Sequence, residues 1–211
     1  MINVENITYR YPHGDAPVIH DYSARFLRGE ISVIRGKNGC GKTTLTKLIA
    51  GILRPSAGRI TINDRDAAEM DLFEIGKVIG YVFQNPNRQL FCDTVFNEVA
   101  YGLRNLKMSS DEVEQNALYY LNLFDLERYR DTYPGKLSHG EKQRLVLAAV
   151  LALGADFLVL DEPATGLDAR RRGELGDILA KLKLEQNCGV ILVSHSPDFI
   201  SRQADRELVM P

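Results

Sequence analysis

The chain has 211 residues, of which 45% are hydrophobic and 26% are charged, so it is long enough to bury one large core. Its 26 basic and 28 acidic side chains nearly cancel, which argues against a polycationic surface for nucleic acid or anionic lipid. Cys40, Cys92 and Cys188 are scattered and odd in number, so neither a disulfide framework nor a zinc site is indicated. This pattern fits a reducing cytoplasm.

The beginning of the chain, Met1 to Glu5, has neither a basic stretch nor an apolar stretch, so we expect no secretory leader. No uninterrupted apolar run in the sequence reaches the length that spans a membrane. If the protein works on a membrane, we therefore expect another chain to provide the span.

The first elements alternate in polarity. Apolar and polar residues alternate over Ile2 to Arg10 and over Val18 to Phe26, which predicts antiparallel strands with one exposed face. Glu30 to Arg35 is a short β-branched run, and it predicts a third strand. After a glycine-rich loop, helical spacing over Thr43 to Leu53 completes the order strand, loop, helix.

The rest of the chain alternates further strands and helices. Asp93 to Leu153 is rich in Leu, Ala, Glu and Tyr, and it indicates a helical insertion. Ala169 to Gln186 predicts another helix. The remaining strand candidates are Gly58 to Ile62, Val78 to Phe83, Phe157 to Leu160 and Gly189 to Val193. The alternation predicts an α/β fold with a parallel sheet, helices on both of its faces and an antiparallel N-terminal lobe.

We expect a single domain over residues 1–211. Within it, residues 1–84 and 156–211 form the core with the antiparallel lobe, and residues 85–155 form a helical subdomain. The sequence shows no internal repeat and no linker.

The glycine-rich loop carries the clearest motif. The run Gly36-Lys37-Asn38-Gly39-Cys40-Gly41-Lys42-Thr43 matches G-x-x-x-x-G-K-[ST] between a strand and a helix. Glycines let backbone N–H groups approach phosphates, and the helix presents its positive end to the same anion. Lys42 supplies a point charge for the β- and γ-phosphates, and the Thr43 hydroxyl can ligate Mg²⁺. The expected nucleotide-binding residues of this stretch are Gly36, Asn38, Gly39, Cys40, Gly41, Lys42, Thr43 and Thr44. A chance glycine turn does not account for the full match.

An acidic pair follows the strand that ends at Leu160. Parallel sheets present ligand sites beyond the carboxyl ends of their strands, where Asp161 and Glu162 fall. Asp161 suits a Mg²⁺ site. Glu162, which would point the other way if the strand continued, is placed to accept a proton from an attacking water. On its own, the pair also fits a solvated acidic turn.

Taken together with these motifs, the sequence resembles an ABC-transporter ATPase subunit along nearly its whole length. The run Leu137-Ser138-His139-Gly140-Glu141 resembles the ABC signature, which sits at a helix N-terminus. The resemblance implies that it caps the γ-phosphate of ATP bound by a partner subunit. By itself, a serine and a glycine before a helix are usually only a helix cap.

Two signature positions depart from the usual pattern. His139 replaces a glycine, and Glu141 replaces the common glutamine as a familiar variant. His139 adds a side chain beside a highly charged ligand. The side chain can weaken the composite site, act as a pH-sensitive contact or point away from the ligand. We favour a harmless side chain or one that weakens the site only mildly.

The same resemblance assigns four more residues. Gln84 corresponds to the Q-loop glutamine, which touches the metal and couples nucleotide state to the membrane partner. Asp168 corresponds to the D-loop aspartate near the dimer interface, and His195 to the switch histidine that contacts the γ-phosphate. Tyr11 lies where the family has an aromatic side chain stacked on adenine, with Tyr9 as the alternative register.

The resemblance implies an ATPase that uses ATP and Mg²⁺ and pairs with a second ABC ATPase subunit, identical or different. Phe83 to Phe91 resembles a segment of the energy-coupling-factor group, in which a short helix after the Q-loop faces a transmembrane coupling protein. That group imports vitamins and cobalt or nickel ions. A peripheral position on the cytoplasmic face of the cell membrane, with no nucleic-acid partner, is therefore expected.

Rival interpretations share parts of this pattern. An exporter or another importer ATPase has the same catalytic residues and differs in its membrane partner. A soluble ABC ATPase acting on DNA or ribosomes normally shows two cassettes, a long coiled coil or a basic arm. A P-loop kinase has no use for the signature or for Asp168. In the segment after Gln84, the simpler alternative is a surface loop with two apolar residues, Leu90 and Phe91, folded beneath it.

Overall fold

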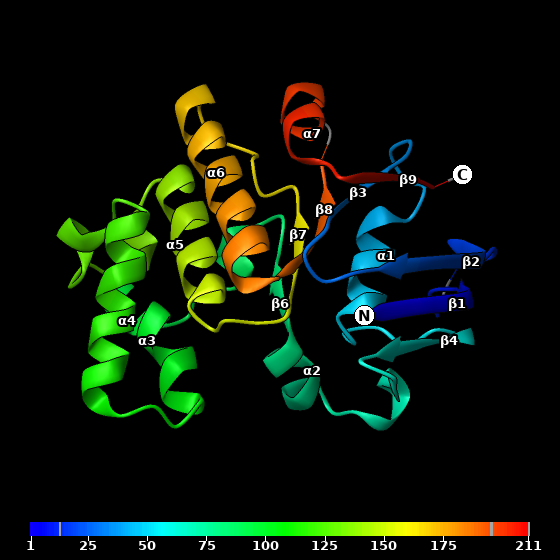
Figure 1. Ribbon diagram of the computed structural model, residues 1–211, viewed down its shortest axis with the longest axis horizontal. Coiled ribbons are helices and arrows are strands. Elements are labelled where there is room, and N and C mark those ends of the chain that lie inside the picture. The colour runs from blue at the N-terminus through cyan, green and yellow to red at the C-terminus, as the bar shows by residue number, and fades with distance from the viewer. Residues whose placement is uncertain (13, 195, 211) are drawn as a thin grey trace.

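A parallel sheet lies between an antiparallel sheet and a group of helices (Figure 1). The computed structural model describes residues 1–12, 14–194 and 196–210. Within these residues, no helix combines the length and the apolar character needed to cross a membrane. The α/β fold class expected from the sequence is confirmed.

The antiparallel sheet has four strands in the order β2-β1-β4-β5, with bounds β1 (Ile2–Tyr9), β2 (Ile19–Phe26), β4 (Ala57–Ile62) and β5 (Arg65–Asp66). Strand β1 pairs on both sides, because Ile2 lies opposite Phe26 on one neighbour and opposite Ile62 on the other. Ile2, Val4 and Ile7 are buried while the residues between them are less so. The expected antiparallel lobe with one wet face is therefore present.

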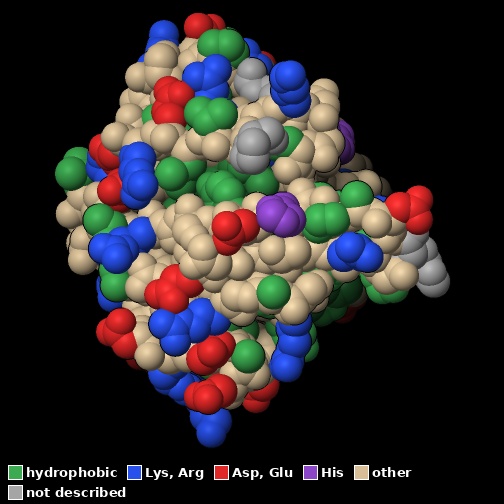
Figure 2. All heavy atoms as spheres, turned by 90° about the vertical axis from the view of Figure 1, so that its right-hand side faces the viewer, with side chains coloured by type: hydrophobic (Ala, Val, Ile, Leu, Met, Phe, Trp, Pro, Cys, Tyr) green, Lys and Arg blue, Asp and Glu red, His purple; other side chains and the backbone are tan. Residues whose placement is uncertain are grey.

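The outer face of this lobe is mixed in charge. Figure 2 looks onto that side of the molecule, and the described acidic and basic side chains are interspersed on it. Within the sheet, Arg59 pairs with Glu5 at 2.6 Å. Pairing of this kind on an exposed strand pair adds little stability, but it neutralises local charge.

The parallel sheet has five strands in the order β6-β7-β8-β3-β9, with bounds β3 (Ile31–Arg35), β6 (Ile79–Val82), β7 (Phe157–Asp161), β8 (Gly189–Val193) and β9 (Arg206–Val209). Every residue of β7 and β8 is buried. Both faces of the sheet are covered, which explains why these strands read as continuous apolar runs.

Helices cover the two faces of the parallel sheet. Helix α1 (Lys42–Ile49) lies on the side of the antiparallel sheet, and α5 (His139–Leu151), α6 (Ala169–Gln186) and α7 (Pro197–Gln203) lie on the other side (Figure 1). Helix α1 is shorter than expected. It ends at Ile49 rather than Leu53 because the chain turns at Gly51, whose φ of 71° is left-handed.

The expected helical insertion contains α3 (Val95–Asn105), α4 (Ser110–Leu123) and α5, with a short connection between α3 and α4 and a longer one over residues 124–138 between α4 and α5. Its apolar residues are continuous with one face of the parallel sheet, since Leu103, Leu121 and Leu145 share a cluster with Leu158 and Leu192. Because the helices share this cluster with the sheet, the division into residues 1–84 with 156–211 and residues 85–155 stays a prediction.

Several short elements were not expected. Helix α2 (Leu72–Val78) begins at a capping box formed by Asp71 and Glu74, and α7 follows Ser196 with Pro197 in its first turn. Four 3₁₀ turns, η1 (Ala67–Glu69), η2 (Pro86–Arg88), η3 (Glu127–Tyr129) and η4 (Pro134–Lys136), join longer elements. Of these, η2 is the exception, because the resemblance placed a short helix after Gln84.

Candidate nucleotide site

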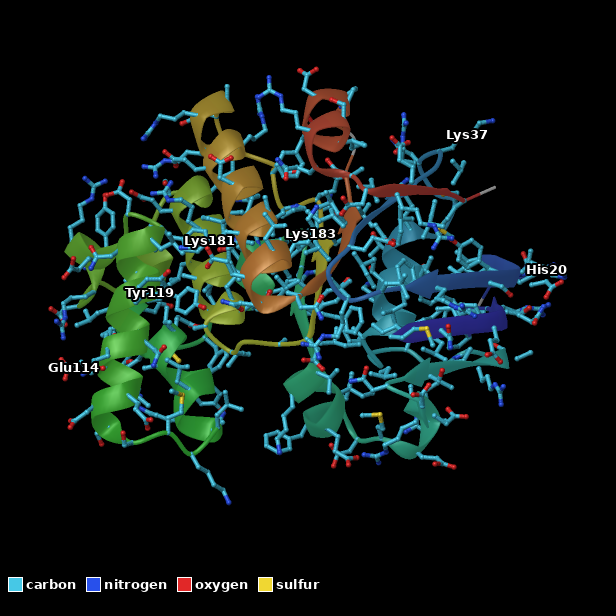
Figure 3. All side chains as sticks on the ribbon, viewed as in Figure 1. His20, Lys37, Glu114, Tyr119, Lys181 and Lys183 are labelled. Atoms are coloured by element: carbon cyan, nitrogen blue, oxygen red, sulfur yellow. The ribbon has the colours of Figure 1, made fainter. Side chains whose placement is uncertain are left out.

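The loop between β3 and α1 is shaped by its glycines. Gly41 precedes α1 with a φ of 97°, in the left-handed region. A Cβ at that position would lie 3.1 Å from both Cγ1 and the carbonyl oxygen of Val18. Only glycine fits both the conformation and the space. Lys37 points outward from the same loop (Figure 3), so the two lysines of the motif face different surroundings.

Lys42 is held against the loop itself. Its Nζ donates hydrogen bonds of 2.9 Å to the carbonyl oxygens of Gly36 and Lys37, and the residue is only 8% exposed. The ammonium group therefore lies at the mouth of the loop. Phosphate oxygens, which carry charge, are stronger acceptors than these carbonyls.

Thr43 and Asp161 bring two oxygen ligands together. The Thr43 hydroxyl donates to Asp161 Oδ2 at 2.8 Å, and Asp161 is 2% exposed at the end of β7. Mg²⁺ in nucleotide sites takes one or two protein oxygens and completes its shell with phosphates and water. Within the described residues, no cluster of three or more His, Cys, Asp or Glu side chains is placed to hold a metal. The Thr43 and Asp161 pair fits Mg²⁺ that arrives with a nucleotide.

Glu162 has an unusual backbone. Strand β7 ends at Asp161, and Glu162 then adopts a φ of 55°, so the strand does not continue and strand alternation does not set the direction of the Glu162 side chain. Its N–H donates to the carbonyl oxygen of Val193, and its own carbonyl oxygen accepts from Thr165 N at 3.1 Å. A left-handed glutamate is strained, and such strain persists only where the surroundings fix it.

These elements meet at a cleft of about 700 Å³. Its lining contains ten of the residues expected from the sequence: Tyr11, Asn38, Gly39, Gly41, Lys42, Thr43, Thr44, Gln84, Asp161 and Glu162. Val18, Thr165 and Val193 complete it and were not expected there. Gly36 and Cys40 belong to the loop but do not line the cleft. His195, the expected switch histidine, lies outside the described residues.

Tyr11 forms one wall of the cleft. Its hydroxyl lies 3.1 Å from Thr44 Oγ1, and its ring meets the Tyr9 ring edge-on at 5.0 Å between centroids. Tyr11 is 38% exposed, whereas Tyr9 is 7% exposed and belongs to the core. The position chosen from the sequence for adenine stacking is therefore the one with an accessible ring.

The signature residues form the start of α5, away from the cleft lining. Ser138 is the N-cap, and it exchanges hydrogen bonds with Glu141 in a capping box. The hydrogen bonds from Ser138 lower the pKa of Glu141. Leu137 is 6% exposed and packs in the core. The ordinary capping role is thus present, and action on a partner's nucleotide stays a prediction.

The segment after Gln84 is more ordered than a plain surface loop. Asn85 caps η2 by accepting from Asn87 N, and Gln89 accepts from Phe83 N while donating to the Tyr81 carbonyl oxygen. The role of Gln89 was missed, because nothing in its sequence context distinguishes it. Leu90 is partly buried against the core.

This segment ends in an exposed aromatic pair. Phe91 is 67% exposed, and its ring meets the Tyr101 ring edge-on at 4.9 Å. Glu98 accepts hydrogen bonds from the N–H groups of Phe91 and Cys92, which fixes the chain just before α3. Burial raises the pKa of Glu98, although these bonds oppose the shift.

Asp168 forms the N-cap of α6. Its Oδ1 accepts from Arg171 N at 2.8 Å, so the expected D-loop aspartate ends the turn that begins after Glu162. It does not line the cleft.

Fold and cleft together define a P-loop nucleotide-binding protein, with a glycine loop before α1 and an acidic pair at the end of a buried parallel strand. The sequence model described as ABC transporter matches residues 19–165. The chain therefore belongs to the ABC transporter family, and it is an ATP-binding and ATP-hydrolysing subunit of that family.

Individual relatives agree with this assignment. A putative ABC transporter ATP-binding protein of Pyrococcus furiosus is 40% identical over 210 residues, covering 100% of this chain and 80% of the relative. The energy-coupling factor transporter ATP-binding protein EcfA2 of Clostridium tetani is 38% identical over 216 residues, covering 99% of this chain and 75% of the relative.

Two solved structures resemble this chain over nearly its whole length. A dimeric ATP-binding cassette in a post-hydrolysis state, with ADP and phosphate bound, superposes with a TM-score of 0.91 at 26% identity, over 100% of this chain and 94% of that one. The cbiO1 protein of Clostridium perfringens is described as part of the ABC transporter complex cbiONQ. It superposes with a TM-score of 0.84 at 32% identity, covering 99% of this chain and 84% of that one.

Proposed function

We propose that this chain is the ATP-driven motor of an energy-coupling-factor type importer that takes up a vitamin or a cobalt or nickel ion. The observation that carries the proposal is the ordered segment from Gln84 to Phe91. Gln84 lines the nucleotide cleft at one end, and Phe91 at the other end forms an exposed aromatic pair with Tyr101 of α3. The similarity to EcfA2 and to cbiO1 supports the same subclass.

In this proposal, the loop and Lys42 hold the phosphates of ATP, and Tyr11 stacks on the adenine. Lys42 exchanges its two loop carbonyls for charged phosphate oxygens. Glu162, at the end of β7, accepts the proton of the attacking water, while Gln84 lies across the cleft. His195 is assigned the γ-phosphate contact by resemblance alone.

Thr43, Asp161 and Gln84 would hold Mg²⁺ together with the nucleotide. The ion would neutralise the charge that develops on the transferred phosphoryl group. The 2.8 Å contact between Thr43 and Asp161 supports this arrangement.

A second ATPase chain completes the site in this proposal. Ser138 and Gly140 lie at a helix start outside the cleft, so they are available to a nucleotide bound by a partner. The dimeric form of a similar cassette supports this arrangement. The two ATPase chains would close around ATP and open after hydrolysis, and this motion would drive a transmembrane coupling chain. The coupling chain would hold the ATPase at the cytoplasmic face of the membrane.

The catalytic assignment is tested with Glu162→Gln. The variant should bind ATP as the wild type does, lose most turnover and accumulate as an ATP-bound dimer, measured by light scattering with and without ATP. Undiminished hydrolysis would remove Glu162 from the proposed role.

The subclass is tested by coexpression with an energy-coupling-factor type transmembrane coupling protein. The wild type should copurify with it, and Phe91→Ala combined with Tyr101→Ala should not, while both forms keep the same ATP affinity. Exclusive copurification with a conventional importer or exporter membrane chain would favour the alternative, an ABC ATPase of a different transporter class.

A further inference from the structure

The nine residues after Glu162, residues 163–171, are attached to the helices α4 and α5 at successive points. Figure 1 shows α5 lying between α4 and α6. Gln143 of α5 is 1% exposed, and its Nε2 donates to the Pro163 carbonyl oxygen at 3.4 Å. The attachment therefore starts directly beside Glu162.

His139 provides the second attachment. A Cβ added at Gly166 would lie 2.8 Å from His139 Cδ2, so the imidazole lies against this glycine of its own chain. The structure shows the His139 imidazole directed at the turn that carries the expected D-loop. A glycine at position 139 would leave that side of Gly166 uncovered.

Asp125 and Arg171 provide the third attachment. Arg171 Nη2 lies 2.7 Å from Asp125 Oδ2, and the Arg171 side chain is 15% exposed whereas that of Asp125 is 53% exposed. Arg171 Nη1 also lies 3.2 Å from Glu174 Oε2 within α6. Asp125 follows α4, and its neighbour Phe124 is held by a hydrogen bond from Arg144 Nε of α5 to its carbonyl oxygen at 2.9 Å. An ion pair between a shielded guanidinium and a carboxylate fixes direction as well as distance.

Arg171 also connects back to the turn. Its backbone N–H donates to Asp168, while its side chain binds Asp125, so one residue ties the N-cap of α6 to the end of α4. At the other end of the segment, Glu162 keeps a left-handed backbone that only a fixed environment sustains. Strand β7 holds Glu162 from one side, and the attached segment holds it from the other.

We propose that Asp125 and Arg171 are positioning residues for ATP hydrolysis, because their ion pair locks residues 163–171 and thereby sets the placement of Glu162 and Asp168. The inference rests on the proposed role of Glu162. It concerns the rate of hydrolysis and not the binding of ATP, since neither residue lines the nucleotide cleft.

The test compares Asp125→Asn, Arg171→Gln and the double variant, using the full chain at saturating ATP and Mg²⁺. Arg170→Gln is the matched control, because Arg170 is the neighbouring arginine and pairs only with Glu174 on the exposed face among the described ion pairs. Each single variant should lower kcat by about threefold to tenfold, and the double variant should be no slower than the slower single variant. The affinity for a non-hydrolysed ATP analogue and the control's kcat should not change.

A purely structural pair would give a different pattern. Wild-type kcat in both single variants, additive losses in the double variant, or a loss of analogue affinity in proportion to kcat would each overturn the inference. Thermal unfolding, followed in parallel, identifies any variant that has lost its fold, and Asp125→Asn keeps the shape of the side chain. A wild type that binds ATP without hydrolysing it would instead overturn the proposed function.

Discussion

The Thr43 hydroxyl donates a hydrogen bond of 2.8 Å to Asp161 Oδ2, joining the first turn of α1 to the end of β7. The two residues are 118 positions apart in the chain. Because Asp161 is almost fully buried, this contact has both a structural and a catalytic consequence, and substitutions separate the two.

Asp161→Asn keeps an oxygen acceptor for Thr43 but loses the negative charge. We expect stability close to wild type and a loss of hydrolysis of at least about a hundredfold, because the proposed Mg²⁺ site loses its carboxylate. Asp161→Ala should lose the same activity and also about 1–3 kcal/mol of stability, since the Thr43 hydroxyl is left without its partner. Urea unfolding and ATPase assays measure both effects. Substantial turnover by Asp161→Asn would contradict the metal role.

Tyr11→Ala should weaken ATP binding by about tenfold, because stacking of a base on an aromatic ring is lost. Tyr11→Phe keeps the ring and removes only the contact with Thr44, so its affinity should stay close to wild type. Fluorescence titration with a labelled ATP analogue measures the difference. Equal affinity in the Ala and Phe variants would show that the ring does not stack on the nucleotide.

Gly41→Ala should destabilise the chain by more than about 1 kcal/mol and impair nucleotide binding, because the position has a φ of 97° and lies against Val18. Gly173→Ala is the control. It lies inside α6, where an added Cβ would meet nothing within 4 Å, so it should stabilise the chain by about 0.5–1 kcal/mol. Denaturation midpoints test the predicted loss of stability in Gly41→Ala and the predicted gain in Gly173→Ala. A Gly41→Ala variant as stable as the wild type would refute the backbone argument.

The capping box at Ser138 predicts a pH dependence. The pKa of Glu141 is lowered by its hydrogen bonds to Ser138, so its charged form stabilises the folded state. This contribution is complete above the ordinary glutamate pKa of about 4.3, and it is lost as the pH falls through the lowered value. Glu141→Gln retains a capping side chain without a charge.

The wild type should therefore exceed Glu141→Gln in stability at neutral pH by about 0.5 kcal/mol, and the difference should disappear in acid. The other carboxylates titrate alike in both proteins, so their contribution cancels in the stability difference. A difference that is the same at both pH values would show that the charge of Glu141 has no part in the cap.

Much of the nucleotide site was predictable because its residues lie in short, ordered motifs. The glycine loop and the Asp161 and Glu162 pair each follow a strand, so the parallel sheet brings them to one edge. Helix α6 and strand β8 also have the bounds expected from their residue patterns. Helix α2 was missed although Asp71 and Glu74 supplied a capping signal, because the helix is only seven residues long.

Other features depend on tertiary contacts that no local pattern encodes. The left-handed backbone of Glu162 contradicts the simple continuation of β7, and the pairing of Asp125 with Arg171 joins residues 46 positions apart. Likewise, the contact of His139 with Gly166 joins residues of separate elements, and no local pattern encodes it.

In the proposed dimer, another chain completes the nucleotide cleft. Mixing two inactive variants tests this most directly. Lys42→Ala lacks the lysine proposed to bind phosphate, and Ser138→Arg blocks the start of α5. A mixed dimer contains one intact pair, Lys42 of one copy facing Ser138 of the other. We predict that mixing restores hydrolysis to about a quarter of the wild-type rate if sites act independently. Where the wild-type chain alone hydrolyses ATP as a dimer of identical copies, a mixture that stays as inactive as its separate components would contradict the claim.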